Sequence, residues 1–249
     1  MFLQSIQLNE KSSVAEIVAG DYRTAEVFRK HGIGYCCGGK WPVDIACEMQ
    51  GVDPKMLRAE LEMATRTNQV SNQVDFSECD TDFIIDYIIN VHHKYLKKSL
   101  PITQEMLVEF AREHVKKYHY LNELESKFDT LVHELKASVQ LEEEVIFPYI
   151  RHLSHAYKHK EPYGTLLIKT LRKPLDGAMS DNHKAITDII LSMRKLTTSY
   201  APPEKACTSH KVVLAKLKEL DNDLMQHFYL EQSILFLRVI TIENELLFG

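Results

Sequence analysis

One stretch near the C-terminus, residues 227–236, constrains the fold more than any other part of the chain. His227 and Glu231 stand four residues apart among leucine and isoleucine side chains. A helix would place this imidazole and this carboxylate on one face, one turn apart. Polar groups that are buried on an apolar face need partners, and a metal ion is one such partner. The stretch therefore predicts a helix that directs metal ligands into a core.

The stretch has an imperfect echo earlier in the chain. Glu142 is followed five residues later by Phe147, as Glu231 is followed by Phe236. Two helices that each carry such an element are typical of a bundle with a carboxylate-bridged di-iron site. The echo lacks one member, because Ser138 occupies the position that matches His227.

Composition excludes several classes of protein. The 249 residues carry a net charge of -5, so no basic surface attracts nucleic acid. No apolar run approaches the roughly 20 residues of a membrane-spanning helix, and the N-terminus does not begin a signal peptide. The five cysteines then favour reduced thiols or metal ligands over a disulfide framework. We expect a cytoplasmic protein that binds neither nucleic acid nor membrane.

Helical periodicity predicts an all-α chain in two parts, a small N-terminal helical module at 1–67 and a four-helix bundle at 81–249, joined by a polar linker at 68–80. In the module, short helices are expected from Ser13 to Gly20, Tyr22 to Lys30, Val43 to Gln50, and Pro54 to about Thr67. In the bundle, helices are expected from Thr81 to about Leu100, from Pro101 to about Tyr118, from Leu121 to about Ile150, and after Pro174 and Pro202-Pro203, with a loop at 151–164.

A glycine loop in the N-terminal module carries two adjacent cysteines, Cys36 and Cys37. Their Cα atoms are about 3.8 Å apart across a trans peptide, so a disulfide between them would be strained and easily reduced. The functional interpretations are thiolate ligation of a metal or cluster, and thiol redox chemistry. The alternative is a glycine turn that contains two small apolar side chains.

In the bundle, each long helix carries one or two candidate metal ligands, namely His93, Glu142, His183, His227 and Glu231. Nitrogen and oxygen ligands without thiolate suit iron or manganese. Periodicity alone does not decide between His92 and His93. The remaining candidates are interpreted as surface or solvated residues, and these are Glu143, Glu144, His114, His119, His133, His152, His155, His159 and His210.

These motifs together resemble one known family, the iron–sulfur cluster repair di-iron proteins of the Repair of Iron Centers family. The residues that carry the resemblance are Phe28-Arg29-Lys30, Tyr35 to Lys40, His92-His93 with Leu100-Pro101, Glu142-Glu143 with Phe147-Pro148, and His227 with Glu231. The resemblance covers nearly the whole chain. The first 60 or so residues are similar to the short Cys-Cys (ScdA-type) domain of that family, and residues 80–245 to its hemerythrin-like bundle.

The resemblance implies a non-heme di-iron centre with four histidines and two bridging glutamates. It assigns His93, His183 and His227 as histidine ligands, and Glu142 and Glu231 as the bridges. The fourth histidine should stand four residues before Glu142, where this chain has Ser138. Water is the simplest replacement, and Glu134 is the first candidate among the side chains.

The function implied by the resemblance is repair of iron–sulfur clusters after nitric oxide or oxidative damage. Damaged iron–sulfur proteins would be the partners, O₂ or NO the small ligand, and a homodimer the expected assembly. Cys36 and Cys37 could pass or accept iron, or reduce the centre. Two alternatives remain open, a hemerythrin-like protein that binds or senses O₂ or NO without turnover, and a scaffold with a degraded metal site. Whether the protein is an enzyme is left undecided.

Overall fold

The computed structural model describes residues 12–35, 39–65 and 75–248, apart from the side chains of 172–181. The described residues form helices and no strand, with one isolated β-bridge between Ser13 and Pro42. The predicted all-α fold is therefore confirmed. The chain divides into two compact units, Met1–Gln73 with Tyr200–Lys218, and Val74–Ser199 with Glu219–Gly249. The proposed linker at 68–80 falls largely outside the described residues.

The first unit contains four short helices in its N-terminal segment, α1 (Val14–Gly20), α2 (Thr24–Lys30), α3 (Val43–Gln50) and α4 (Pro54–Thr65). The predicted capping box begins α1, because Ser13 Oγ accepts from the Glu16 amide and Glu16 accepts from the Ser13 amide. Gly51 ends α3 at a φ of 65°, which suits glycine. Phe28 and Leu57 are fully buried and give this unit its core.

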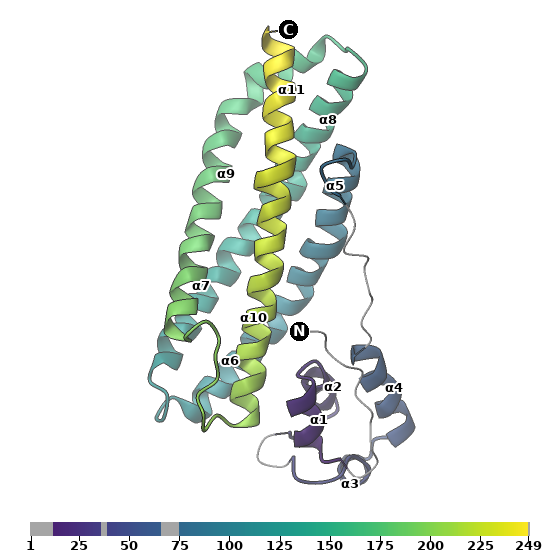
Figure 1. Cartoon of the computed structure of the whole chain (residues 1–249), viewed down its shortest axis with the longest axis vertical. Helices are drawn as coiled ribbons and strands as arrows, with labels where there is room; N and C mark the ends of the chain where they lie inside the picture. Colours follow the sequence, from purple (N-terminus) through teal and green to yellow (C-terminus); the bar gives the residue numbers. More distant parts are fainter. Residues whose placement is uncertain (1–11, 36–38, 66–74, 249) are drawn as a thin grey trace. The chain divides into compact units, whose positions relative to one another are not determined.

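The second unit is built from long helical rods that lie side by side (Figure 1). The first rod is α5 (Thr81–Tyr87), a π-helical turn (Ile88–His93) and α6 (Lys94–His114). The second is α7 (Tyr120–Leu141), a π turn (Glu142–Ile146) and α8 (Phe147–Lys158). The third is α9 (Tyr163–Leu196). The last is α10 (Thr208–Tyr229), a π turn (Leu230–Leu235) and α11 (Phe236–Phe248), with α10 shared between the two units.

The helices run past several prolines at which the sequence predicted boundaries, so those predictions were wrong. Pro101 lies inside α6 and Pro174 inside α9, while the last helix begins at Thr208 rather than at Pro202-Pro203. A proline removes one backbone hydrogen bond from a helix interior. For α6, the burial of Leu96, Leu100 and further residues of one face offsets this loss.

The predicted loop at 151–164 is also mostly helical, since α8 continues to Lys158 and α9 begins at Tyr163. Gly164, which favoured a loop, is instead a contact point between helices. A Cβ added there would lie 3.0 Å from Leu246 and 3.2 Å from Ala156. Glycine is present because α9 passes close to α8 and α11, not because the chain turns.

One apolar cluster in the core of the second unit is drawn from α5, the three π turns, α8, α9 and α11, with Ile85, Phe147, Leu153 and Leu235 among its most buried members. In the described residues, no helix is both long enough and apolar enough to cross a membrane.

Candidate metal centre

Each of the three π turns in the second unit contains a predicted metal ligand. His93 is the last residue of the first π turn, Glu142 the first residue of the second, and Glu231 lies in the third. A π turn inserts one extra residue into a helix and is rare, and it occurs frequently at functional sites. The insertions rotate the neighbouring side chains relative to a regular helix. The remaining candidates, His183 and His227, lie in the α-helical segments α9 and α10.

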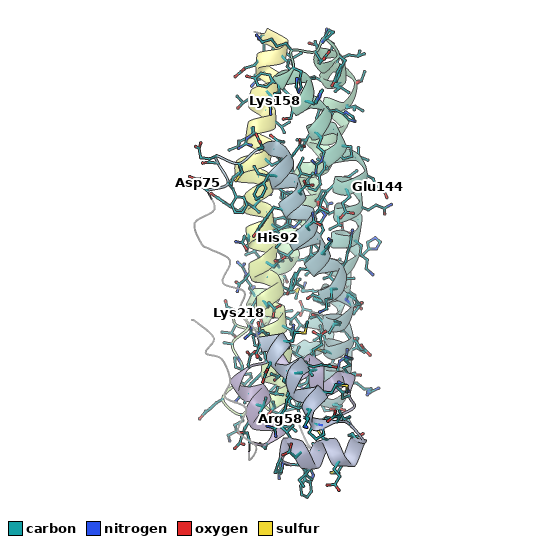
Figure 2. All side chains as sticks on the ribbon, turned by 90° about the vertical axis from the view of Figure 1, so that its right-hand side faces the viewer. Arg58, Asp75, His92, Glu144, Lys158 and Lys218 are labelled. Carbon is teal, nitrogen blue, oxygen red and sulfur yellow. The ribbon has the colours of Figure 1, made fainter. Side chains whose placement is uncertain are left out.

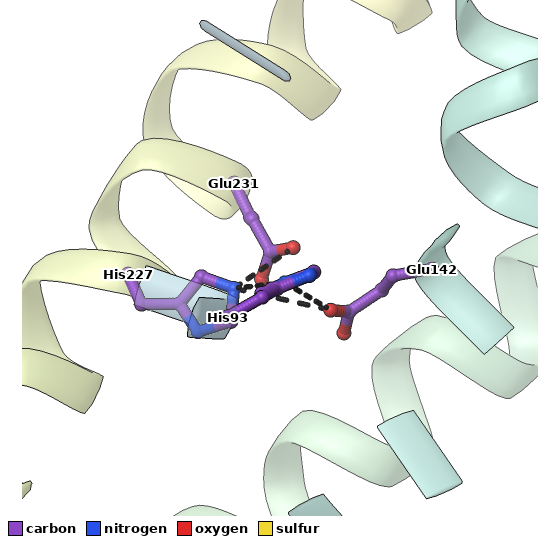
Figure 3. Close-up of side chains that lie close together, drawn as sticks. All are labelled: His93, Glu142, His227 and Glu231. Atoms are coloured by element: carbon purple, nitrogen blue, oxygen red, sulfur yellow. Dashed lines mark hydrogen bonds and ion pairs between the residues drawn. The ribbon is translucent and has the colours of Figure 1, made fainter. Parts of the chain in front are cut away.

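Four of these side chains converge in the core of the bundle (Figure 3), namely His93, Glu142, His227 and Glu231. Their ligand atoms all lie within 4.8 Å of one another, which is close enough to hold one metal ion. The Nε2 atom of His93 lies 3.1 Å from Glu142 Oε2. The Nε2 atom of His227 lies 3.3 Å from Glu231 Oε1 and 3.9 Å from Glu142 Oε2.

His183 approaches the other side of the same two carboxylates. Its Nε2 atom lies 3.3 Å from Glu231 Oε2 and 3.6 Å from Glu142 Oε1. Each glutamate therefore turns one oxygen toward the pair His93 and His227, and its second oxygen toward His183. Two carboxylates that are shared in this way have the arrangement that bridges two metal ions in a helical bundle.

Ser138 lies on the His183 side of the cluster. Its Oγ atom donates a hydrogen bond of 2.6 Å to Glu142 Oε1, the oxygen that also faces His183. The serine thus contacts the bridge candidate rather than extending into the space between the carboxylates. One side of the cluster has two imidazoles, and the other has one imidazole and a hydroxyl.

The electrostatics of the cluster fit a bound cation. Both oxygens of Glu231 and Oε2 of Glu142 are buried without a hydrogen-bond partner, although imidazoles lie close by. Burial acts to raise the pKa of both carboxyls, but the neighbouring imidazoles outweigh it and hold each pKa below its usual value. Burying two carboxylates whose oxygens accept no hydrogen bond costs free energy unless a cation compensates their charge.

The same carboxylates act on the histidines. Burial lowers the pKa of His183, but its contacts with Glu142 and Glu231 outweigh this and raise it to about 9. The pKa of His227 is also raised, chiefly by the charge of Glu231 working against burial. In the absence of metal, protons on these imidazoles supply the positive charge that a metal ion would otherwise supply.

Side chains around the cluster contact the outer nitrogens of two of its imidazoles, those of His93 and His183. Glu143 Oε1 lies 2.8 Å from His93 Nδ1, and the same carboxylate pairs with Lys97 at 2.7 Å. Gln232 Nε2 lies 2.9 Å from His183 Nδ1. A carboxylate that accepts a proton from the outer nitrogen, as Glu143 does from His93, fixes the orientation of metal-binding imidazoles in other proteins.

The structure separates His92 from His93, which periodicity alone did not. Both side chains are buried, but only His93 reaches the two carboxylates. His92 places Nδ1 3.0 Å from Asp223 Oδ1, and its ring is stacked on that of His227 at 5.5 Å with an interplanar angle of 6°. His92 therefore supports a candidate ligand rather than belonging to the cluster.

Two residues interpreted as surface positions are more buried than expected. Glu143, expected to be solvated, is 26% exposed and contacts His93, whereas the neighbouring Glu144 projects outward (Figure 2). His210 is fully buried. For Glu143, the π turn that begins at Glu142 shifts the helical face on which the side chain lies; the burial of His210, on α10, has no such local cause.

The other predicted positions have simpler outcomes. Glu134, the substitute suggested for the missing histidine, is half-buried, and no described contact joins it to the cluster. The side chains of His152, His155 and His159 are exposed. Cys36 and Cys37 lie outside the described residues.

Comparison with known proteins supports the resemblance that the motifs indicated. Residues 10–65 match the ScdA_N family, described as a domain of unknown function (DUF542). The chain is 26% identical over 229 residues to the iron-sulfur cluster repair protein ScdA of Staphylococcus haemolyticus, covering 92% of this chain and 98% of the relative. It is 27% identical over 231 residues to the iron-sulfur cluster repair protein YtfE of Escherichia coli O8, covering 92% and 97%. The YtfE protein of Edwardsiella ictaluri is 26% identical over 227 residues, covering 91% and 96%.

Proposed function

We propose that this chain, which resembles proteins named for iron–sulfur cluster repair over 92% of its length, is itself a non-heme di-iron repair protein. It would act on iron–sulfur clusters damaged by nitric oxide or oxidative stress. The observation that carries the proposal is the pair Glu142 and Glu231, whose carboxylates each offer one oxygen to either side of a buried histidine cluster.

In this proposal each side of the cluster would hold one ion. His93 and His227 would hold one, His183 would hold the other, and both ions would share the carboxylates of Glu142 and Glu231. Iron at these positions would supply redox cycling between Fe(II) and Fe(III) and open positions for O₂ or NO. Aromatic rings beside the histidines limit the access of water to the cluster. Phe147 is stacked on His93 at 5.6 Å, and Phe228 lies 4.7 Å from His183, each measured between ring centroids.

Around this centre, the chain's own residues orient the ligands. A metal ion on Nε2 leaves the proton of His93 on Nδ1, where Glu143 accepts it. On the other side, the Ser138 hydroxyl holds Glu142 Oε1 by its hydrogen bond. The His183 side offers one imidazole fewer than the other side, so an ion held there would be more open to a small ligand.

This open position also favours a second candidate function, which is the binding or sensing of O₂ or NO without turnover. The two functions share one centre and differ in whether a reaction takes place after the small ligand binds. A third alternative, a scaffold without metal, fits less well, because it leaves two buried carboxylates compensated only by protonated imidazoles and both Glu231 oxygens without a hydrogen-bond partner.

The remaining parts of the proposal rest on the resemblance. Cys36 and Cys37 would pass or accept iron, or reduce the centre, from the segment that matches the ScdA_N family. A homodimer in the cytoplasm would be the working form, and damaged iron–sulfur proteins would be the partners.

The test combines iron counting with recovery of a damaged client. The protein is purified anaerobically, and iron is counted per chain. An enzyme whose [4Fe–4S] cluster was damaged with nitric oxide is then incubated with the protein, and its activity is followed. Recovery that requires the iron-loaded protein supports repair. Reversible NO binding without recovery supports sensing, and a chain that retains no iron refutes both.

A further inference from the structure

We propose a second metal site, formed by His155 and His159 at the end of α8, that binds a divalent cation of the zinc, nickel and copper(II) class. The site lies on the surface of the second unit and shares no residue with the buried cluster. It does not depend on the function proposed above.

The backbone places the two histidines one helical turn apart. The amide of His159 donates to the carbonyl of His155 at 3.0 Å, so the i, i+4 relation holds through the last turn of α8. The imidazole rings lie together, with centroids 4.3 Å apart and an interplanar angle of 39°. Zinc-binding helices chelate their ion with two histidines at this spacing of four residues.

The outer nitrogen of one imidazole already has a partner. The Tyr163 hydroxyl, at the start of α9, lies 3.2 Å from His155 Nδ1. With Nδ1 donating its proton to this hydroxyl, Nε2 is left as the lone-pair donor for a cation. A metal-binding histidine whose other nitrogen is hydrogen-bonded has its tautomer and ring orientation fixed in advance.

The surroundings offer negative charge and space. Both histidines line an open depression of about 590 Å³, which also contains Asp80, Asp82 and Glu245. Asp82 pairs with Arg151 at 2.7 Å, and Glu245 accepts a hydrogen bond from the Tyr157 hydroxyl. The C-terminal end of α8 adds the partial negative charge of its last carbonyl groups, which favours a cation. Among the basic side chains of the depression, Arg238 donates to the carbonyls of Ser77 and Cys79, and Lys158 is exposed (Figure 2).

The donor set determines which ion binds. A site with two imidazole nitrogens, completed by a carboxylate or by water, should follow the general order of metal affinity. Copper(II) binds most tightly in this order, and nickel and zinc bind more tightly than iron(II). The exposed pair would therefore select against the ion proposed for the buried centre. Occupancy would also join the end of α8 to its neighbours, to α9 through Tyr163 and to α11 where Glu245 takes part.

The experiment uses the full chain after iron loading, so that the buried centre is filled, and titrates it with zinc by calorimetry. We expect one further zinc to bind per chain. His155→Gln or His159→Gln should each weaken this zinc at least as much as loss of a supporting partner does, about 10- to 100-fold. His133→Gln, an exposed histidine on α7, is the matched control and should leave the zinc affinity unchanged. Both target side chains are exposed, so circular dichroism without zinc should be the same for all variants.

Two outcomes would overturn the proposal. One is the absence of a further stoichiometric zinc, or a zinc whose affinity is unchanged in the double variant His155→Gln with His159→Gln. The other concerns His152, which is exposed three residues before His155: His152→Gln weakening zinc more than His159→Gln would show that a different pair binds. Copper(II) added to the iron-loaded wild-type protein gives a check without substitutions, since its electron paramagnetic resonance spectrum should show coupling to two nitrogens.

Discussion

Replacing Glu143 by glutamine should weaken metal binding at the buried centre without disturbing the bundle. The Glu143 carboxylate lies 2.8 Å from His93 Nδ1, and its side chain is 26% exposed. Glutamine keeps an acceptor for the imidazole proton but removes the negative charge that makes the ligand more basic. Loss of such a partner costs about 10- to 100-fold in metal affinity. Because Glu143 is partly exposed and shares its charge with Lys97, screening places the effect at the low end, about tenfold or roughly 1.4 kcal/mol.

The assay is an anaerobic competition of the protein with a chromophoric chelator for Fe(II). Glu144→Gln is the matched control, because Glu144 is the next residue, is exposed, and contacts Gln140 rather than a histidine. We expect Glu143→Gln to release the more tightly held iron, the one on the His93 side, at about one tenth of the chelator concentration that the wild-type protein needs, and Glu144→Gln to match the wild type. Equal iron affinities in the two variants would refute the role given to Glu143.

A second substitution tests the direction of the effect. Lys97→Met frees the Glu143 carboxylate from its ion pair of 2.7 Å and leaves its full charge to act on His93. Iron binding should then be equal to or tighter than that of the wild type. In the Glu143→Gln background, Lys97→Met should have no effect, because the charge that it modulates is gone. An equal loss of affinity from Lys97→Met in both backgrounds would mean that Lys97 acts on the centre by another route.

Three further variants test the centre and the division of the chain. Glu231→Ala should abolish binding of two irons, since it removes a carboxylate shared by both sides of the cluster; two irons per chain by metal analysis would refute its role as a bridge. Cys36→Ser with Cys37→Ser should leave the iron count unchanged while impairing repair in cells, and a loss of bundle iron would show that the cysteines share the site. Ser138→His should tighten the more weakly held iron in a chelator titration, because histidine four residues before Glu142 reproduces the spacing of His227 and Glu231. Two equally tight irons in the unchanged protein would contradict this expectation.

Sequence reasoning located the ligand candidates because their signal is local. The spacing of His227 and Glu231 places both side chains on one face of any regular helix, and the structure keeps them on one face, with Nε2 and Oε1 3.3 Å apart. The capping box at Ser13 and the glycine at position 51 are equally local, and each begins or ends a helix as expected. Such features depend on the backbone within one turn.

The predictions of helix boundaries at prolines were wrong because a helix boundary depends on packing that is not local. Pro101 has the same local cost wherever it occurs, about 3 kcal/mol in a helix interior. Whether a helix continues depends on the apolar area that it buries on both sides of the proline, and fully burying one leucine contributes about 1.5–3 kcal/mol. Leu96, Leu100 and Leu107 are all buried in α6. The balance between the cost of Pro101 and the burial of these leucines depends on the neighbouring rods, and the sequence of α6 alone does not reveal how they pack.

The π turns explain why the supporting residues were missed although the ligands were found. A regular helix would turn Glu142 inward and carry the adjacent Glu143 toward solvent. The extra residue of the turn Glu142–Ile146 changes the angle at which successive side chains leave the helix. Glu142 is therefore buried while Glu143 still reaches His93. Three such turns each contain a candidate ligand. A π turn replaces good helical hydrogen bonds by poorer ones, and a cluster that binds a metal ion offers a compensating free energy that packing alone does not.

The position of Ser138 gives the cluster its asymmetry. Its hydroxyl donates to Glu142 Oε1, and that oxygen faces His183, the side with a single imidazole. A hydroxyl that donates to a carboxylate oxygen lowers its charge density and competes with an ion for its lone pairs. At the proposed second position the serine would therefore weaken metal binding twice, because it supplies no nitrogen ligand and because it donates to the Glu142 oxygen on that side. The His93 and His227 side keeps both imidazoles and the Glu142 oxygen that has no hydrogen-bond partner. If the centre holds two ions, they differ in affinity, and the ion beside Ser138 is the one that leaves first and the one that a small ligand reaches.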